Sequence, residues 1–186
     1  MSTRAARSRD DVVRTAGRLF AERGYHGTSM RDLAAELGLL GSSLYSHISS
    51  KEDLLVEVVE RGADLFQSSA DSALATSGPP VNRLKALVDG HVGVVLDHLD
   101  EVRTFLNEAG ALDEVHRKRV LAARDRYEAS FRAVLSELNV ENPKLAAIFL
   151  LSVLNAVERW YRPSGPLKRE QLADEVFRFA MTGIKP

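Results

Sequence analysis

Residues 28–55 read TSMRDLAAELGLLGSSLYSHISSKEDLL, and this stretch predicts three helices in close succession. The motif Ser29-x-x-Asp32 resembles a capping box and precedes apolar residues that recur three and four positions apart, as on one face of a helix. Gly38 is the type of residue that ends such a helix. A short helix from about Ser42 to His47 follows, and Ser50-x-x-Asp53 opens a third helix, which is long.

The two short helices around Gly38, with a supporting helix that should end at Gly24, have the proportions of a helix-turn-helix. In that motif the first helix crosses the phosphate backbone of DNA and the second lies in the major groove. The second helix therefore needs an apolar anchor facing inward, which Leu44 supplies, and small polar residues facing outward. The candidate polar residues are Ser42, Ser43, Tyr45 and His47.

The rest of the chain also shows helical periodicity, and no strand-like alternation stands out. The clearest linker is residues 76–80, TSGPP. Residues 146–154 are apolar on every side, which predicts a helix segment buried all round. The predicted fold class is all-α, with about nine helices. Beyond residue 50 they should cover about 51–75, 84–99, 102–112, 114–138, 143–162 and 168–184.

Bulk composition narrows the possible functions. The chain has 186 residues, of which 45% are hydrophobic, enough for a buried core. It has no cysteine, which excludes disulfides, thiol catalysis and cysteine-ligated metals. It has no run of about 20 apolar residues, so we expect no membrane span. The default expectation is a cytoplasmic protein.

The net charge is −1, but the charges are unevenly distributed. Residues 1–31 carry seven arginines and three acids, whereas residues 32–60 carry one lysine and six acids. An arginine-rich N-terminal arm suits contact with DNA phosphates. A solvated, disordered tail would have the same composition, so charge alone does not separate the two interpretations.

Four blocks of the N-terminal region together resemble the signature of the Tet repressor family in their order and spacing. These blocks are LFAERGY at 19–25, TSMRDLA at 28–34, SLYSH at 43–47 and SKEDLL at 50–55. The resemblance implies a homodimeric transcriptional regulator rather than an enzyme. It implies a DNA-binding domain over residues 1–50 and a ligand-binding and dimerisation domain over residues 51–186. The last two helices would form the dimer interface, and the partner would be a palindromic double-stranded operator.

The resemblance also assigns individual DNA-binding residues. By position, the phosphate contacts would be Thr28, Tyr45, His47 and Lys51. Ser42 and Ser43 would face the bases, with Arg31 as a further contact. The chain departs from the family pattern in having Leu40 where a polar residue is common, Gly41 where Lys or Arg is common, and Ile48 where Phe is usual.

Polar residues in the penultimate helix suggest a binding function for the C-terminal region. Ser152, Asn155 and Arg159 are spaced three and four residues apart, so they share one face of a mostly apolar helix. Polar groups on a buried helix need partners. The spacing leaves open whether those partners are protein groups, a ligand or a second subunit.

Three segments are similar to the subgroup of Tet repressor relatives that controls fatty-acid and sterol catabolism and responds to acyl-coenzyme A thioesters. They are GLLGSSLY at 38–45, RDRYE at 124–128 and NAVERWYRPSGPL at 155–167. The resemblance implies an apolar tunnel for an acyl chain, arginines for the coenzyme phosphates and an aromatic ring for its adenine. The ligand-binding candidates are Phe105, Arg124, Phe149, Asn155, Arg159, Trp160 and Arg162. No metal and no cofactor other than this effector is expected.

Two other functions fit the sequence less well. A drug-efflux regulator of the same family would favour an aromatic-rich pocket, but only 6% of the residues here are aromatic. A helical enzyme or adaptor is the other alternative, because Glu108, Asp113, Glu114 and His116 lie close together in the sequence. The last three residues, however, fall where a helix should begin, and acidic residues are favoured at that position.

Overall fold

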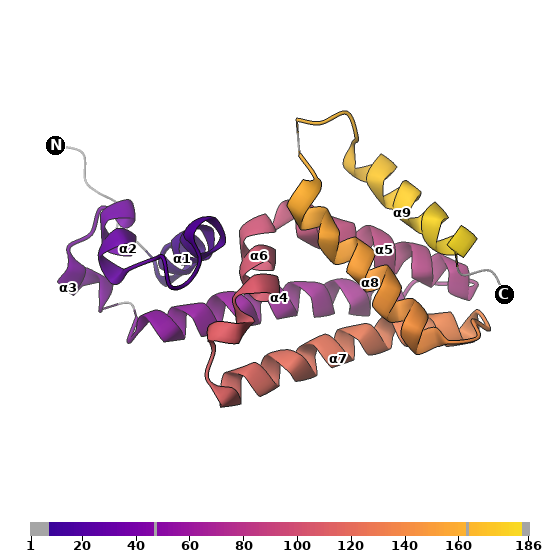
Figure 1. Ribbon diagram of the computed structural model, residues 1–186, viewed down its shortest axis with the longest axis horizontal. Helices are drawn as coiled ribbons and strands as arrows, with labels where there is room; N and C mark the ends of the chain where they lie inside the picture. The colour runs from indigo at the N-terminus through magenta and orange to yellow at the C-terminus, as the bar shows by residue number, and fades with distance from the viewer. Residues whose placement is uncertain (1–7, 47, 163, 184–186) are drawn as a thin grey trace. The chain divides into compact units, whose positions relative to one another are not determined.

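The computed structural model describes residues 8–46, 48–162 and 164–183. Over these residues the chain forms nine α-helices, one short 3-10 helix and no β-strand, which confirms the predicted all-α class (Figure 1). None of the helices within these ranges has the length and apolar character needed to cross a membrane. The helices are α1 (Arg9–Arg23), α2 (Met30–Leu37), α3 (Gly41–Leu44), α4 (Lys51–Leu74), α5 (Pro80–Asp97), α6 (Leu99–Asn107), η1 (Ala109–Ala111), α7 (Glu114–Glu137), α8 (Pro143–Trp160) and α9 (Arg169–Gly183).

The chain packs as two compact units. The first combines the N-terminal segment up to Gly62 with Asp100–Val120, and the second combines Ala63–Leu99 with the chain from Leu121 onward. Both α4 and α7 therefore continue from one unit into the other. This division describes packing, and the functional boundary expected at residue 50 stays a prediction.

Helix ends in the first unit follow the capping chemistry expected from the sequence. The backbone N–H of Ser29 donates to the Asp32 carboxylate at 2.9 Å, and the N–H of Asp32 donates to the Ser29 hydroxyl at 3.1 Å. Gly38 ends α2 in the left-handed conformation, with φ 65°, which glycine adopts without strain. The predicted capping box and helix stop are confirmed.

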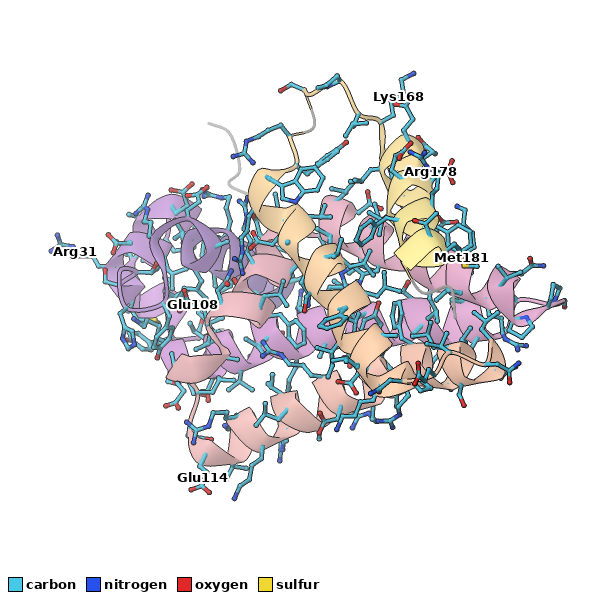
Figure 2. The ribbon with its side chains drawn as sticks, turned by 45° about the vertical axis from the view of Figure 1, so that its right-hand side comes forward. Arg31, Glu108, Glu114, Lys168, Arg178 and Met181 are labelled. Carbon is cyan, nitrogen blue, oxygen red and sulfur yellow. The ribbon has the colours of Figure 1, made fainter. Side chains whose placement is uncertain are left out.

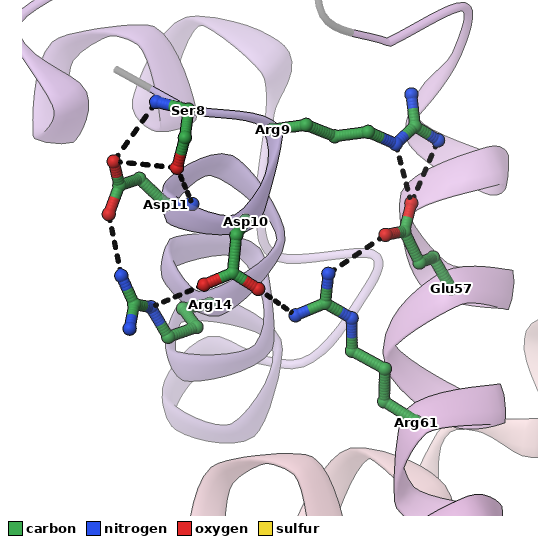
Figure 3. Close-up of polar contacts among 7 residues, drawn as sticks. All are labelled: Ser8, Arg9, Asp10, Asp11, Arg14, Glu57 and Arg61. Carbon is green, nitrogen blue, oxygen red and sulfur yellow. Dashed lines mark hydrogen bonds and ion pairs between the residues drawn. The ribbon is translucent and has the colours of Figure 1, made fainter. Parts of the chain in front are cut away.

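Ion pairs connect α1 to α4 within the first unit (Figure 3). Arg9 on α1 lies 2.8 Å from Glu57 on α4, and Arg61 on α4 lies 2.6 Å from Asp10 and 3.0 Å from Glu57. Arg14 also pairs with Asp10, at 3.5 Å. Exposed pairs of this kind contribute at most about 1 kcal/mol each. Some arginines of the basic N-terminal segment thus have carboxylate partners within the protein.

In the second unit, α5 packs against both α8 and α9 (Figure 1). Arg169, at the start of α9, lies 2.6 Å from Asp97 at the end of α5. A Cβ atom at Gly93 would overlap the Arg169 guanidinium, so the glycine makes room for this pair. Lys85 joins the same two helices through Asp174 at 2.8 Å. These contacts fix α9 along α5.

The expectation that residues 146–154 are buried all round is wrong for the single chain. Ala147, Leu150 and Leu154 are buried, but Phe149 is 62% exposed and Ile148 is 40% exposed. Hydropathy alone predicts only that an apolar face will be covered. It does not say whether the same chain or another covers it.

Candidate nucleic-acid interface and effector site

The helix-turn-helix of the first unit consists of α2, a connection over residues 38–40 and α3, with α2 and α3 in contact. Leu44 is fully buried and anchors α3 to the small core, as the sequence predicts. Leu40 precedes α3 in an extended conformation, with φ −73° and ψ 148°. Within α3, Gly41 and Ser42 are exposed, whereas Leu44 faces the core.

Four of the predicted DNA-binding residues lie on the surface of this motif. Ser42 and Tyr45 are exposed, and Ser43 is half-buried. The side chain of Arg31 is exposed and projects away from the helices (Figure 2). His47, a predicted phosphate contact, lies outside the described residues. Contact of these residues with DNA stays a prediction.

Thr28 is buried, and its hydroxyl is used within the chain. Its single proton is shared between the carbonyl oxygens of Gly24, at 3.0 Å, and Leu19, at 3.2 Å. These bonds tie the end of α1 to the segment that precedes α2. These hydrogen bonds give the Thr28 hydroxyl a role in folding. The predicted phosphate contact of Thr28 stays a prediction.

Lys51 also makes internal contacts that sequence reasoning missed. Its ammonium group donates to the carbonyl oxygens of Tyr25 at 2.7 Å and Thr28 at 2.8 Å, and it lies 4.0 Å from the centroid of the Tyr25 ring. Lys51, the first residue of α4, is thus hydrogen-bonded to the segment between α1 and α2. Backbone carbonyl acceptors leave no signal in a residue pattern, so the sequence could not indicate this role.

The predicted effector residues are divided between the two compact units, and their binding of a ligand stays a prediction. Phe105 is buried in the first unit, whereas the other six candidates belong to the second unit. Phe149 lines a hollow of about 420 Å³ between α8 and α9 rather than the interior of the unit. Phe179 lies on the same hollow and is 61% exposed.

The C-terminal end of α8 presents cationic and aromatic side chains to solvent. Arg159 and Arg162 are exposed, and Trp160 is 50% exposed. Arg159 lies 3.3 Å from the Glu158 carboxylate, and Arg162 donates to the carbonyl oxygen of Arg159 at 3.1 Å. The end of α8 thus carries two guanidinium groups and an indole ring within four residues, all exposed to solvent.

A polar pair inside the second unit was not predicted. His91 on α5 is 1% exposed, and its Nδ1 atom lies 3.0 Å from the hydroxyl of Tyr127 on α7. The Phe66 ring from α4 lies 4.8 Å from the imidazole, and Phe131 packs against Tyr127. Burial lowers the pKa of His91 to about 3, so the ring is neutral at physiological pH. The available signal was a histidine on the apolar face of the helix expected at 84–99.

Arg124 lies three residues before Tyr127 on α7, and is half-buried. Burial lowers the pKa of its guanidinium below the usual arginine value, although arginine stays charged in proteins. The interior of the second unit thus combines an aromatic cluster with histidine and tyrosine groups, and α7 adds a half-buried cation.

The acidic cluster that suggested an enzyme is a helix start. The backbone N–H of His116 donates to the Asp113 carboxylate at 2.8 Å, and the His116 ring lies 2.9 Å from the same carboxylate. These bonds hold the pKa of Asp113 below its ordinary value. Within the described residues, no group of three His, Cys, Asp or Glu side chains has a geometry that could hold a metal ion.

Comparison with known proteins agrees with this geometry. Residues 12–58 match the family model described as bacterial regulatory proteins of the tetR family. Residues 77–184 match the model described as a tetracyclin repressor-like C-terminal domain. The HTH-type transcriptional repressor KstR2 of Rhodococcus jostii is 31% identical over 95% of this chain and 90% of its own length.

Two solved structures are also similar over nearly the whole chain. AibR, in a complex with isovaleryl coenzyme A and operator DNA, is 29% identical with a TM-score of 0.83, over 92% of this chain and 96% of AibR. The ketosteroid transcriptional regulator KstR2 of Mycobacterium tuberculosis is 25% identical with a TM-score of 0.88, over 96% of this chain and 95% of that one. The two family models, the helix-turn-helix and the all-α second unit lead to one conclusion: the chain belongs to the TetR family of DNA-binding transcriptional regulators.

Proposed function

We propose that this protein is a homodimeric repressor that leaves a palindromic operator when an acyl-coenzyme A thioester binds its second unit. The observation that carries the ligand class and the DNA partner is the likeness to AibR, whose structure holds isovaleryl coenzyme A and operator DNA together. Release of the operator by the thioester is the part of the proposal that the titration in the Discussion tests. Repression is favoured by the KstR2 relatives, which are named as repressors.

The exposed end of α8 suits the coenzyme part of such a ligand. Coenzyme A carries phosphates, which arginine binds through paired N–H donors, and an adenine, which can stack on an aromatic face. Arg159, Arg162 and Trp160 supply both chemistries within four residues and face solvent. The acyl chain needs an apolar environment instead, which the aromatic cluster around Phe66 and Phe131 offers.

Calorimetric titration tests this part of the proposal. Octanoyl-CoA and isovaleryl-CoA should bind the wild type, and the double variant Arg159→Gln/Arg162→Gln should weaken binding by about tenfold or more, as expected for lost charge-assisted hydrogen bonds. Arg132→Gln on α7 is the matched control, because Arg132 is also an exposed arginine paired with a carboxylate. Equal binding by the double variant and the control would refute the assignment of these arginines. A wild type that ignores both thioesters would refute the ligand class.

The apolar surface of α8 and α9 supports the homodimer. Phe149 and Phe179 are each more than 60% exposed and line the hollow between these helices. Ile148 and Leu145 on α8 extend the surface. Contiguous exposed apolar surface of this kind marks interaction sites, and a second copy would cover it with the same face. Two reading helices would then lie about 34 Å apart, one turn of DNA.

Light scattering with size-exclusion chromatography tests the interface. The wild type should elute as a dimer, whereas Phe149→Glu/Phe179→Glu should elute as a folded monomer with much weaker operator binding. Leu121→Glu is the control, because Leu121 is 50% exposed but lies on α7 outside this surface. A dimer that survives the double substitution would place the interface elsewhere.

A further inference from the structure

Leu40 has the highest exposed fraction of any large apolar side chain among the described residues, at 76%. It stands directly before α3, the second helix of the helix-turn-helix. Its neighbour Leu39 is half-buried and Leu44 is fully buried, so the core of this unit does not use Leu40. Exposed apolar area is unfavourable in water and is relieved when a partner covers it.

Gly41, the first residue of α3, has no reason within the described structure to be glycine. Its backbone is not in the left-handed region, unlike that of Gly38. A Cβ atom built at Gly41 would meet no described atom within 4 Å. No contact or backbone conformation among the described residues therefore requires glycine at this position.

The first residues of a reading helix contact base edges in the major groove. Among the groups on those edges, the thymine C5 methyl is the apolar one, and it pairs with apolar side chains. The missing side chain at Gly41 permits close approach of the backbone to DNA. We propose that Leu40 contacts a thymine methyl in each half of the operator, and that Gly41 allows the approach that this contact needs.

This inference rests on DNA binding and not on the effector. Leu40 cannot form a hydrogen bond, so it does not distinguish guanine from adenine by donors and acceptors. It distinguishes bases with a methyl group from bases without one. Ser42 and Ser43, which follow on α3, remain available for polar contacts. The operator should therefore require a methylated pyrimidine at one symmetric position of each half.

The test uses an operator selected with the full-length wild-type protein from randomised DNA duplexes. Each thymine is then replaced singly by deoxyuridine, which lacks only the methyl group, and binding is measured by fluorescence anisotropy at fixed salt. At one symmetric position we expect about three- to tenfold weaker binding, the scale of one buried methyl group. 5-Methylcytosine paired with guanine there should bind more tightly than unmethylated cytosine.

Protein variants link this effect to Leu40. Leu40→Ala should bind the thymine and deoxyuridine duplexes equally at that position, while Val115→Ala keeps the wild-type preference. Val115 is 60% exposed on α7 and serves as the matched control. Leu40→Gln is a second variant that should also lose the preference. Circular dichroism checks that each variant is folded.

Gly41→Ala tests the role of the glycine separately. It should leave the melting temperature unchanged or slightly higher, because an added Cβ meets no described atom within 4 Å, and weaken operator binding by about tenfold. The inference is overturned if no thymine methyl matters to the wild type, if Leu40→Ala keeps the preference, or if Gly41→Ala binds as tightly as the wild type. A selection that returns no duplex would instead refute DNA binding itself, whereas failure of acyl-CoA to bind would leave this inference standing.

Discussion

The Nδ1 atom of His91 lies 3.0 Å from the hydroxyl of Tyr127 in the interior of the second unit. If the Tyr127 O–H donates to Nδ1, the neutral His91 ring carries its proton on Nε2. The Nε2–H group is then the one donor of the pair that needs another partner. The opposite assignment leaves both the Tyr127 O–H and the Nε2 lone pair unused. The first arrangement leaves fewer buried groups unsatisfied, so it is favoured.

Burial of His91 makes stability depend on pH. The pKa of His91 is lowered from 6.5 to about 3 in the folded state, so below pH 6.5 the unfolded chain binds a proton that the folded chain does not. The free energy of unfolding therefore does not depend on His91 above about pH 6.5, and it decreases as the pH falls from there toward 3. In this window His91 should lower the free energy of unfolding by up to about 1.4 kcal/mol for each pH unit of acidification. Urea denaturation between pH 7 and pH 4 measures the slope.

His91→Phe should remove that share of the pH dependence, because phenylalanine has no titrating group. Tyr127→Phe should lower the free energy of unfolding by about 1 kcal/mol through the lost hydrogen bond. It should keep the pH slope, since His91 stays buried. An unchanged slope in His91→Phe would show that other groups cause the acid sensitivity.

Lys51 should contribute to folding as well as to any DNA contact. Lys51→Met removes the hydrogen bonds to the carbonyl oxygens of Tyr25 and Thr28, and we expect a loss of about 1–3 kcal/mol in the free energy of unfolding. Lys118→Met is the control. Lys118 is highly exposed and its ion pair among the described residues is with Glu114 on the same helix, so its loss should change stability by less than about 0.5 kcal/mol. Equal stability of the two variants would contradict the structural role of Lys51.

Close packing at Gly62 gives a test of the α4–α6 contact in the first unit. A Cβ atom there would lie 2.8 Å from the Cβ of Phe105 and 3.1 Å from the carbonyl oxygen of Glu101. Gly62→Ala should therefore lower the free energy of unfolding by about 1–3 kcal/mol. Gly110→Ala is the matched control, since a Cβ there meets no described atom within 4 Å. Thermal denaturation compares the two, and a stable Gly62→Ala variant would contradict the contact.

Local chemistry allowed much of the fold to be predicted. The capping box of Ser29 and Asp32 and the helix stop at Gly38 depend on neighbours in sequence, and both are present. The buried anchor Leu44 follows from the same reasoning, because its position within a short helix fixes which side faces the core.

The effector candidates cannot be derived from local chemistry in the same way, because the proximity of such residues depends on how distant helices pack, and they stay a prediction. Helical spacing placed Asn155 and Arg159 on one face, but it gave no information on Phe105, which belongs to the other compact unit. The same limit explains why His91 and Tyr127 were missed as a pair, since they lie 36 residues apart on two helices. The exposed Leu40 was visible in the sequence only as a departure from the family pattern.

Fluorescence anisotropy of a labelled operator duplex measures directly whether the thioester controls DNA binding. The protein is bound to the operator and then titrated with octanoyl-CoA or, separately, with free coenzyme A. A ligand that drives nearly complete release must prefer the non-binding form by about 5.5 kcal/mol. We expect salt-sensitive binding that the thioester reverses and free coenzyme A does not. An operator complex that survives saturating thioester, while calorimetry shows the thioester bound, would contradict it.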